Sequence, residues 1–212
     1  MRKVLLTFPV VLLAAAAPVG PAVVRVRLET SAGPITLALD ARRAPITTAN
    51  FLAYVDDRRF EGTTFYRAAR SKARPGRGFV QAGVRSDLRR ALPPIRLEPT
   101  GRTGIRHLDA TVSMARGVFD DSATGNFVLT VGPSPQMDAR PGFAGYAAFG
   151  RVAAGMDTVR RILAQPTGGG VGVMRGQMLL RPVTITRAVR LDGRPKPTGR
   201  PKVWLILRGR GG

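Results

Sequence analysis

Two polar side chains, Arg67 and Gln81, stand in apolar, strand-like runs within the segment 60–83. Phe65 and Arg67 alternate with Tyr66, so an extended strand would place Phe65 and Arg67 on one face, with the guanidinium against an aromatic wall. Burying an unpaired guanidinium is costly, so an inward Arg normally has a partner or a function. A guanidinium is a permanently protonated, planar hydrogen-bond donor. The pair therefore predicts chemistry by hydrogen-bond donation; the alternative is an arginine on a solvated strand face.

Nucleophilic, thiol and metal chemistry find little support in the sequence. There is no Cys, which excludes disulfides and thiolate metal sites, and His107 is the single histidine. His107 with Asp109 is interpreted as a satisfied surface or edge histidine, although one Ser-His-Asp arrangement can be proposed. Asp120 and Asp121 are typical of a turn, because no further carboxylates follow at oxygen-ligand spacing. The glycine-rich segment 168–172 lacks the Lys-Ser/Thr end of a phosphate loop and predicts a flexible connector. We expect neither a metal nor a cofactor.

The charge balance is strongly basic. The chain has 34 Lys and Arg against 13 Asp and Glu, a net charge of +21 over 212 residues. Such a field favours anionic partners, including nucleic acid and acidic unfolded chains. The arginines are scattered, however, aromatic residues are 6% of the chain, and there is no recognised RNA-binding motif. We therefore expect no specific nucleic-acid partner.

The first 22 residues have the pattern of a bacterial secretory signal. Arg2 and Lys3 precede an apolar run over 4–17, and small residues follow around Ala17 and Ala22. Cleavage after Ala22 would remove these two basic side chains and change the net charge from +21 to +19. An uncleaved anchor is the alternative, but the run is short for a bilayer span. We expect export to the periplasm and no stable membrane insertion after removal of the signal.

The pattern from residue 23 to residue 191 predicts one mainly β domain. Alternating apolar and polar residues indicate short strands, and two segments have helical periodicity, from about Pro45 to Asp57 and after Gly155. About eight strands with two helices predict a closed eight-stranded antiparallel β-barrel capped by two α-helices. The strands are expected at 24–29, 35–39, around Arg67, around Gln81, and at 110–115, 126–131, 146–152 and 183–191. A loop is expected over 85–104, where prolines interrupt pairing.

The last segment, 192–212, is a basic tail rich in Pro and Gly around an apolar island at 203–207. Its composition predicts disorder. The alternative is a segment that docks on a surface or touches a membrane.

Seven segments, in order, resemble the cyclophilin-type peptidyl-prolyl cis-trans isomerases, particularly their exported bacterial members. The resemblance covers about 24–191, nearly the whole mature chain. It rests on these segments: TSAGPITLALD, APITTANFLAYV, FEGTTFYR, FVQAG, TVSMAR, DDSATGNFVLTV and YAAFGRVAAGMDTV. The family implies an eight-stranded barrel with a helix over each end, which agrees with the prediction from periodicity.

The resemblance also implies roles for individual residues. Arg67 stands where the family has its catalytic arginine, and Gln81 where it has a substrate-orienting glutamine. Phe79, Val128 and Met137 would line a pocket for the proline ring. The full set of implied substrate-binding residues is Tyr66, Phe79, Ala115, Arg116, Asn126, Val128, Gln136, Met137 and Tyr146. The implied substrates are proline-containing polypeptides, with no cofactor, and we expect a monomer.

Several of these positions depart from the family pattern. Tyr66 replaces a histidine, Asn126 a glutamine and Val128 a phenylalanine, and Gln136-Met137 replace a Trp-Leu pair. Either Gly78 or Phe79 takes the place of a pocket aromatic. These replacements predict reduced activity. A non-catalytic proline-binding or chaperone-like module with the same groove is the alternative, and Val128 and Gln136 are the positions that favour it.

Overall fold

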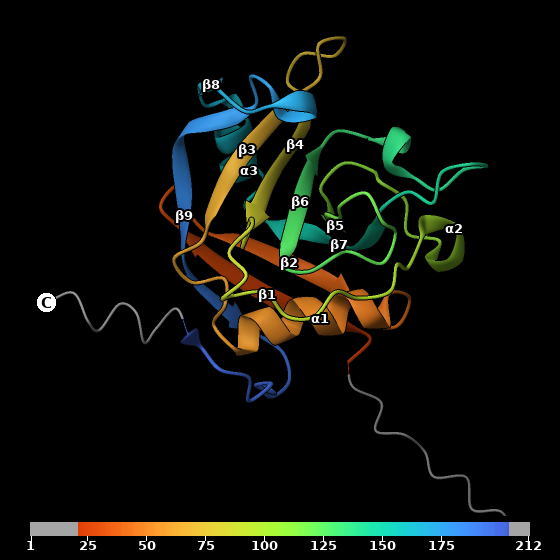
Figure 1. Cartoon of the computed structure of the whole chain (residues 1–212), viewed down its shortest axis with the longest axis vertical. Coiled ribbons are helices and arrows are strands. Elements are labelled where there is room, and N and C mark those ends of the chain that lie inside the picture. The colour runs from red at the N-terminus through yellow and green to blue at the C-terminus, as the bar shows by residue number, and fades with distance from the viewer. Residues whose placement is uncertain (1–20, 204–212) are drawn as a thin grey trace, which may run out of the picture.

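The computed structural model describes residues 21–203, and within them nine strands form one sheet. The sheet is the most extensive feature of the molecule (Figure 1). The strands are β1 (Val23–Thr30), β2 (Ile35–Asp40), β3 (Thr64–Arg70), β4 (Gly78–Gly83), β5 (Thr111–Met114), β6 (Asn126–Val131), β7 (Ala147–Ala154), β8 (Thr167–Gly168) and β9 (Met178–Arg190).

Eight of these strands close into an antiparallel barrel. The order is β1-β2-β7-β5-β6-β4-β3-β9, and β9 pairs back with β1, while the two-residue β8 only extends β9. Strict alternation explains the inner face: Val24, Val26 and Leu28 of β1 are buried, whereas Arg25 and Arg27 are exposed. The predicted closed eight-stranded barrel is confirmed.

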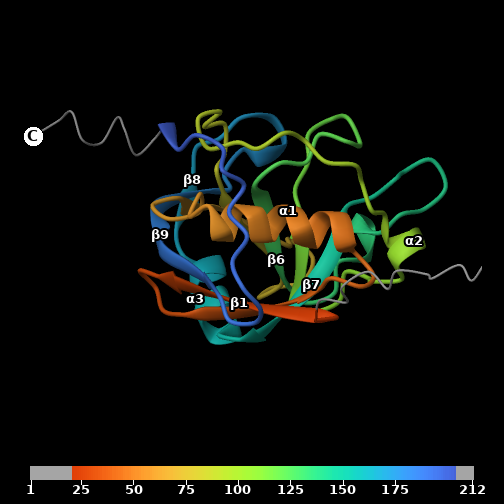
Figure 2. The ribbon, with the colours of Figure 1, turned by 90° about the horizontal axis from the view of Figure 1, so that it is seen from below.

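Two helices pack against the barrel as predicted. In α1 (Pro45–Asp56), Pro45 occupies the first turn, where its missing N–H has no cost. Figure 2 shows α1 lying across one end of the barrel. The ring centroid of its Phe51 lies 4.9–5.5 Å from those of three other core rings, Phe60, Phe127 and Phe149. Helix α3 (Met156–Ala164) packs against β3, β4, β2 and β6 through its buried apolar stripe.

The structure differs from the prediction in two elements. A four-residue helix, α2 (Thr100–Thr103), ends at the left-handed Gly104 within the segment predicted as loop. Strand β9 begins at Met178, five residues before the expected start. Its pairing with β3 jumps from Met178 to Val183, so Pro182 lies in a bulge where it need not donate to the ladder. The short helices η1 (Pro135–Met137) and η2 (Gly172–Met174) also lie in segments between strands.

The described part of the tail, 192–203, is ordered against the end of α1, which corrects the expectation of disorder. Thr198 donates to Asp57 through its backbone N–H at 2.7 Å and its hydroxyl at 2.5 Å, and Arg59 donates to the carbonyl of Arg200 at 3.3 Å. Asp57 and Arg59 form an ion pair of 2.8 Å, with side chains 1% and 2% exposed. The tail therefore covers a buried charge pair. The apolar island at 203–207 lies almost entirely outside the described residues, as does the predicted signal.

Candidate active site

A bulge in β3 decides which way the candidate catalytic side chains face. Phe65 pairs with Ala82, but the next partner, Gln81, faces Arg67, so Tyr66 is an extra residue between them. Phe65 and Ala82 belong to the barrel core, and so does the Ala68–Val80 pair on the other side of Arg67 and Gln81. Arg67 and Gln81, which pair between these core residues, therefore face away from the core. The prediction that Phe65 and Arg67 share a face is therefore wrong, because simple alternation fails at the bulge. The bulge places both Tyr66 and Arg67 outside the core.

Arg67 is fixed by two glutamines. Its Nη1 donates to Gln81 Oε1 at 3.0 Å, while its Nε and Nη2 donate to Gln177 Oε1 at 2.9 and 2.7 Å. Burial lowers the pKa of Arg67, whereas Tyr66 and Tyr146 act in the opposite direction. A guanidinium has five N–H groups, so two remain for a ligand. The alternative of a solvated strand arginine does not hold, because this side chain is half-buried and held in place.

Sequence reasoning missed Gln177, which contributes two of the three hydrogen bonds to Arg67. It lies between η2 and β9, and its Nε2 donates to the carbonyl of Val173 at 3.1 Å, which leaves Oε1 facing Arg67. The backbone carbonyl of Gln177 also accepts from Ala68 N at 2.9 Å. The only signal in the sequence was an amide beside a glycine-rich segment, and this is common in loops.

We expect Gln177→Ala to lower kcat/KM for a proline-containing peptide about tenfold, because a donor that loses two fixing bonds samples unproductive orientations. Steady-state kinetics of isomerisation measures this effect. Gln165→Ala is the matched control, since the Gln165 side chain makes no hydrogen bond among the described residues. Equal rates for Gln177→Ala and the parent would contradict the assigned role.

The aromatic partner of Arg67 is Phe79, whose ring centroid lies 5.1 Å from the guanidinium carbon. The neighbouring position, Gly78, has no room for a side chain. Its φ is +148°, and a Cβ there would lie 2.1 Å from the carbonyl oxygen of Ala69. Of the two positions considered from the sequence, Phe79 is therefore the one that carries an aromatic ring beside Arg67. The predicted aromatic contact exists, but with Phe79 rather than Phe65.

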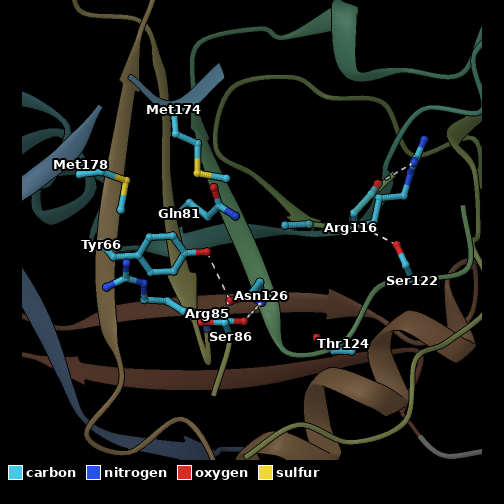
Figure 3. Close-up of a pocket in the computed structure, with 12 residues that line it drawn as sticks. Tyr66, Gln81, Arg85, Ser86, Arg116, Ser122, Thr124, Asn126, Met174 and Met178 are labelled. Carbon is cyan, nitrogen blue, oxygen red and sulfur yellow. Dashed lines mark hydrogen bonds between the residues drawn. The ribbon is translucent and has the colours of Figure 1, made fainter. Parts of the chain in front are cut away.

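A cleft of about 310 Å³ brings together five of the predicted residues (Figure 3). Arg67 does not line this cleft, but it donates to Gln81, which does. Tyr66 and Asn126 meet across it, with the Tyr66 hydroxyl donating to Asn126 Oδ1 at 3.3 Å. Burial raises the pKa of Tyr66 to about 12, although Arg85 and Arg67 act in the opposite direction. Its hydroxyl is therefore protonated at neutral pH. The predicted residues that line the cleft are Tyr66, Gln81, Ala115, Arg116 and Asn126.

The remaining predicted residues lie near this cleft without lining it. Val128 is buried outside the core cluster and pairs with Gln81 across β4 and β6. Met137, also buried outside that cluster, accepts a hydrogen bond from Tyr146 N at 3.0 Å through its carbonyl. The Arg116 guanidinium stacks on the Tyr146 ring at 5.2 Å. Gln136 is the exception, because its side chain is exposed.

His107 was predicted to lie at the surface or at an edge, but its side chain is buried, with 1% of the residue exposed. Its partner is Asp138 rather than Asp109, at 2.6 Å from Nδ1, while Asp109 accepts from Gly132 N. Asp109 is near His107 along the chain, but the fold brings Asp138, 31 positions away, against the imidazole. Among the described residues there is no group of three or more potential metal ligands, and no helix long and apolar enough to cross a membrane.

The protein is thus a closed antiparallel β-barrel, and its candidate site, around Arg67, lies on the outer face of the barrel wall. A family model described as "Cyclophilin type peptidyl-prolyl cis-trans isomerase/CLD" matches residues 25–190. The chain belongs to the cyclophilin-type peptidyl-prolyl cis-trans isomerase family.

Individual relatives agree with this assignment. The chain is 38% identical to peptidyl-prolyl cis-trans isomerase A of Dickeya dadantii over 139 residues, which are 65% of this chain and 70% of the relative. It is 36% identical to peptidyl-prolyl cis-trans isomerase cyp18 of Streptomyces antibioticus over 166 residues, 77% of this chain and 96% of that one. A crystal structure of a cyclophilin type isomerase from Cryptosporidium parvum matches in fold, with a TM-score of 0.64, 17% identity, and coverage of 81% and 99%.

Proposed function

We propose that this chain accelerates rotation about X-Pro bonds in exported or folding polypeptides, with Arg67 as the donor to the prolyl nitrogen. The observation that carries the proposal is the fixed guanidinium: three of its N–H groups are engaged by Gln81 and Gln177, and two are left for a ligand. The assignment of the chain to the isomerase family supports it. A Cryptosporidium parvum relative was crystallised in the presence of the dipeptide Ala-Pro.

The chemistry needs neither nucleophile nor metal. Rotation about the X-Pro bond has a barrier of roughly 20 kcal/mol, because amide resonance must be broken. In the ground state the amide nitrogen is a poor acceptor, whereas twisting localises its lone pair. A donor aimed at this nitrogen therefore stabilises the transition state selectively. One preorganised donor in a water-poor site contributes about 3 kcal/mol, or on the order of a hundredfold in rate.

The other residues would bind and orient the substrate. Gln81 would steer the substrate carbonyl, since its amide already faces both Arg67 and the cleft. Phe79, Val128 and Met137 would receive the proline ring; the last two are buried outside the core cluster, as expected of groups that face a ligand rather than the barrel interior. We expect the protein to act as a monomer. An isomerisation assay on a short proline peptide tests this function.

A non-catalytic proline-binding module is the second candidate. The smaller Val128 and the exposed Gln136 favour it, because neither closes a pocket as the larger residues of the family pattern would. Peptide affinity without rate acceleration would select it.

We further propose that the protein acts in the periplasm after loss of its first 22 residues, on the strength of their charge and apolar pattern. After expression in a Gram-negative host, we expect the protein in the periplasmic fraction, with an intact mass that begins at Val23. Recovery from the cytoplasm with Arg2 and Lys3 still present would refute export.

A further inference from the structure

His107 is the centre of a buried hydrogen-bond network that the proposed mechanism does not use. Its Nδ1 lies 2.6 Å from Asp138 Oδ1, and its Nε2 lies 2.8 Å from Ser113 Oγ. Ser113 is 0% exposed, and its hydroxyl also lies 3.2 Å from the carbonyl oxygen of Ala147. The order Ser, His, Asp is that of a hydrolase triad. A serine with no exposed surface cannot reach a substrate, however, so this network does not form a hydrolase site.

The two side-chain partners of His107, and the carbonyl that Ser113 also contacts, each lie beside a residue predicted to contact substrate. Asp138 directly follows Met137, and Ala147 directly follows Tyr146. Ser113 is the register partner of Val128 across β5 and β6. We call Val128, Met137 and Tyr146 the prolyl wall. The network therefore joins, through the His107 imidazole and the Ser113 hydroxyl, the three backbone segments that carry this wall.

The backbone reinforces the same connection. Ser134 N donates to the carbonyl of His107 at 2.8 Å, and His107 N donates to Asp138 Oδ1 at 3.0 Å. Helix η1, which carries Met137, is thus tied to His107 on both sides. Tyr146 N in turn donates to the Met137 carbonyl, which links η1 to the start of β7.

We propose that His107 is a positioning residue for the prolyl wall, and that its protonation at acidic pH loosens this wall and lowers activity. This inference rests on the proposed function for its consequence in activity, but the structural link between His107 and the wall stands apart from that function.

The hydrogen bonds explain how one proton changes the network. With neutral His107, Nδ1–H donates to Asp138, and Nε2 accepts the hydroxyl proton of Ser113. When solvent supplies a proton to Nε2, the imidazolium must donate to Ser113 Oγ, and the hydroxyl has to turn toward the Ala147 carbonyl. Protonation therefore reverses the hydrogen bond between Ser113 and His107 and commits the Ser113 hydroxyl to the Ala147 carbonyl, so the contacts that hold the wall change.

The electrostatic balance sets the direction of the effect. Burial lowers the pKa of His107, and the nearby Asp138, the charged group that faces it from η1, raises it by less. The contacts from β5 and β7, Ser113 and the Ala147 carbonyl, are neutral. Because the folded-state pKa lies below the unfolded one, the neutral form contributes stability that is lost as pH falls through the folded-state pKa. The wall should therefore be ordered at neutral pH and loosened by acid.

The experiment is a pH profile of kcat/KM from pH 8 to pH 5 for the parent and His107→Gln. No other side chain in this sequence has an ordinary pKa in that range, and Arg67 stays protonated throughout. We expect the parent to lose about three- to tenfold as the imidazole titrates. His107→Gln should be slower at pH 8 and should show no such fall. A flat parent profile, or an unchanged profile in His107→Gln, would overturn the proposal.

Methyl NMR separates this inference from the proposed function and from a folding defect. The single histidine gives one set of imidazole signals, and the methyl signals of Val128 and Met137 should titrate with the same midpoint. Ser113→Ala should abolish that response, whereas Thr158→Ala, which removes another buried hydroxyl, should retain it. If the methyl signals of Val128 and Met137 do not shift as the imidazole titrates, the role of His107 is overturned, whether or not the parent is an isomerase.

Discussion

Replacing Arg67 with alanine is expected to lower kcat/KM for a proline-containing peptide about a hundredfold while leaving the barrel folded. The reason is the loss of one preorganised donor that acts only on the twisted imide, for which about 3 kcal/mol is typical. Because Arg67 pairs with Gln81 on the face of the sheet away from the core, its removal should leave the interior packing unchanged. Steady-state kinetics gives the rate, and thermal unfolding followed by circular dichroism verifies the fold.

Two further variants separate the donor from its charge. Arg67→Lys keeps the charge but lacks the planar fork that meets Gln81 and Gln177 together, so it should recover little of the activity. Arg187→Ala removes one positive charge from an exposed position on β9 and should behave as the parent does. A loss in Arg187→Ala comparable to that in Arg67→Ala would mean that net charge, not a positioned donor, drives the reaction.

Replacing Asp57 with alanine is expected to destabilise the fold by about 3 kcal/mol, because it takes the carboxylate away from a buried guanidinium. Both side chains of the Asp57–Arg59 pair are almost fully buried, and Thr198 of the tail donates twice to the same carboxylate. The change therefore also removes two of the hydrogen bonds that hold the tail at the end of α1. Urea unfolding at pH 7 measures the difference in the free energy of unfolding.

The same pair predicts an acid dependence. Burial raises the pKa of Asp57, but hydrogen bonds from Thr198 and Arg59 together with the charge of Arg59 lower it by more, so the pKa lies below its ordinary value. The stabilisation is therefore present above the unfolded-state pKa and is lost as pH falls through the folded-state pKa. Asp57→Ala should flatten this acid loss. Asp157→Ala, at an 85% exposed side chain paired with Arg160, is the control and should cost less than about 1 kcal/mol.

The barrel could be predicted from the sequence because its strands follow simple alternation. In β1 and β2, Val26, Leu28, Ile35 and Leu37 all face the core, as a period of two requires. Helix α1 was equally clear, since Pro45 marks its first turn. Local rules suffice where neighbouring residues along the chain decide burial.

The details of the site depend on contacts between distant residues, which local rules do not reach. The bulge at Tyr66 reverses the face of Arg67, yet FYR alone has nothing to distinguish it from a regular strand. Gln177 is 110 positions from Arg67, and the offset pairing of β3 with β9 brings them together. His107 and Asp138 are 31 positions apart and meet only because the chain at Ser134 returns to the segment before β5.

The described part of the tail, residues 192–203, is a second case in which local sequence rules do not predict the structure. Its Pro, Gly and Arg content is typical of disorder, but Thr198 donates to the buried carboxylate of Asp57, directly after α1. Composition alone cannot reveal a partner that the rest of the fold provides. Order in this segment thus comes from tertiary hydrogen bonds rather than from its own propensity.

The most direct test is NMR exchange spectroscopy on a short Xaa-Pro peptide, with catalytic amounts of the parent and of Arg67→Ala and no protease present. The parent should broaden and exchange the cis and trans signals far faster than the uncatalysed reaction, and Arg67→Ala should return them close to the uncatalysed rate. If the peptide binds the parent, as shown by shifts at Val128 and Met137, while the exchange stays at the uncatalysed rate, the protein is a proline-binding module and Arg67 is not a catalytic residue.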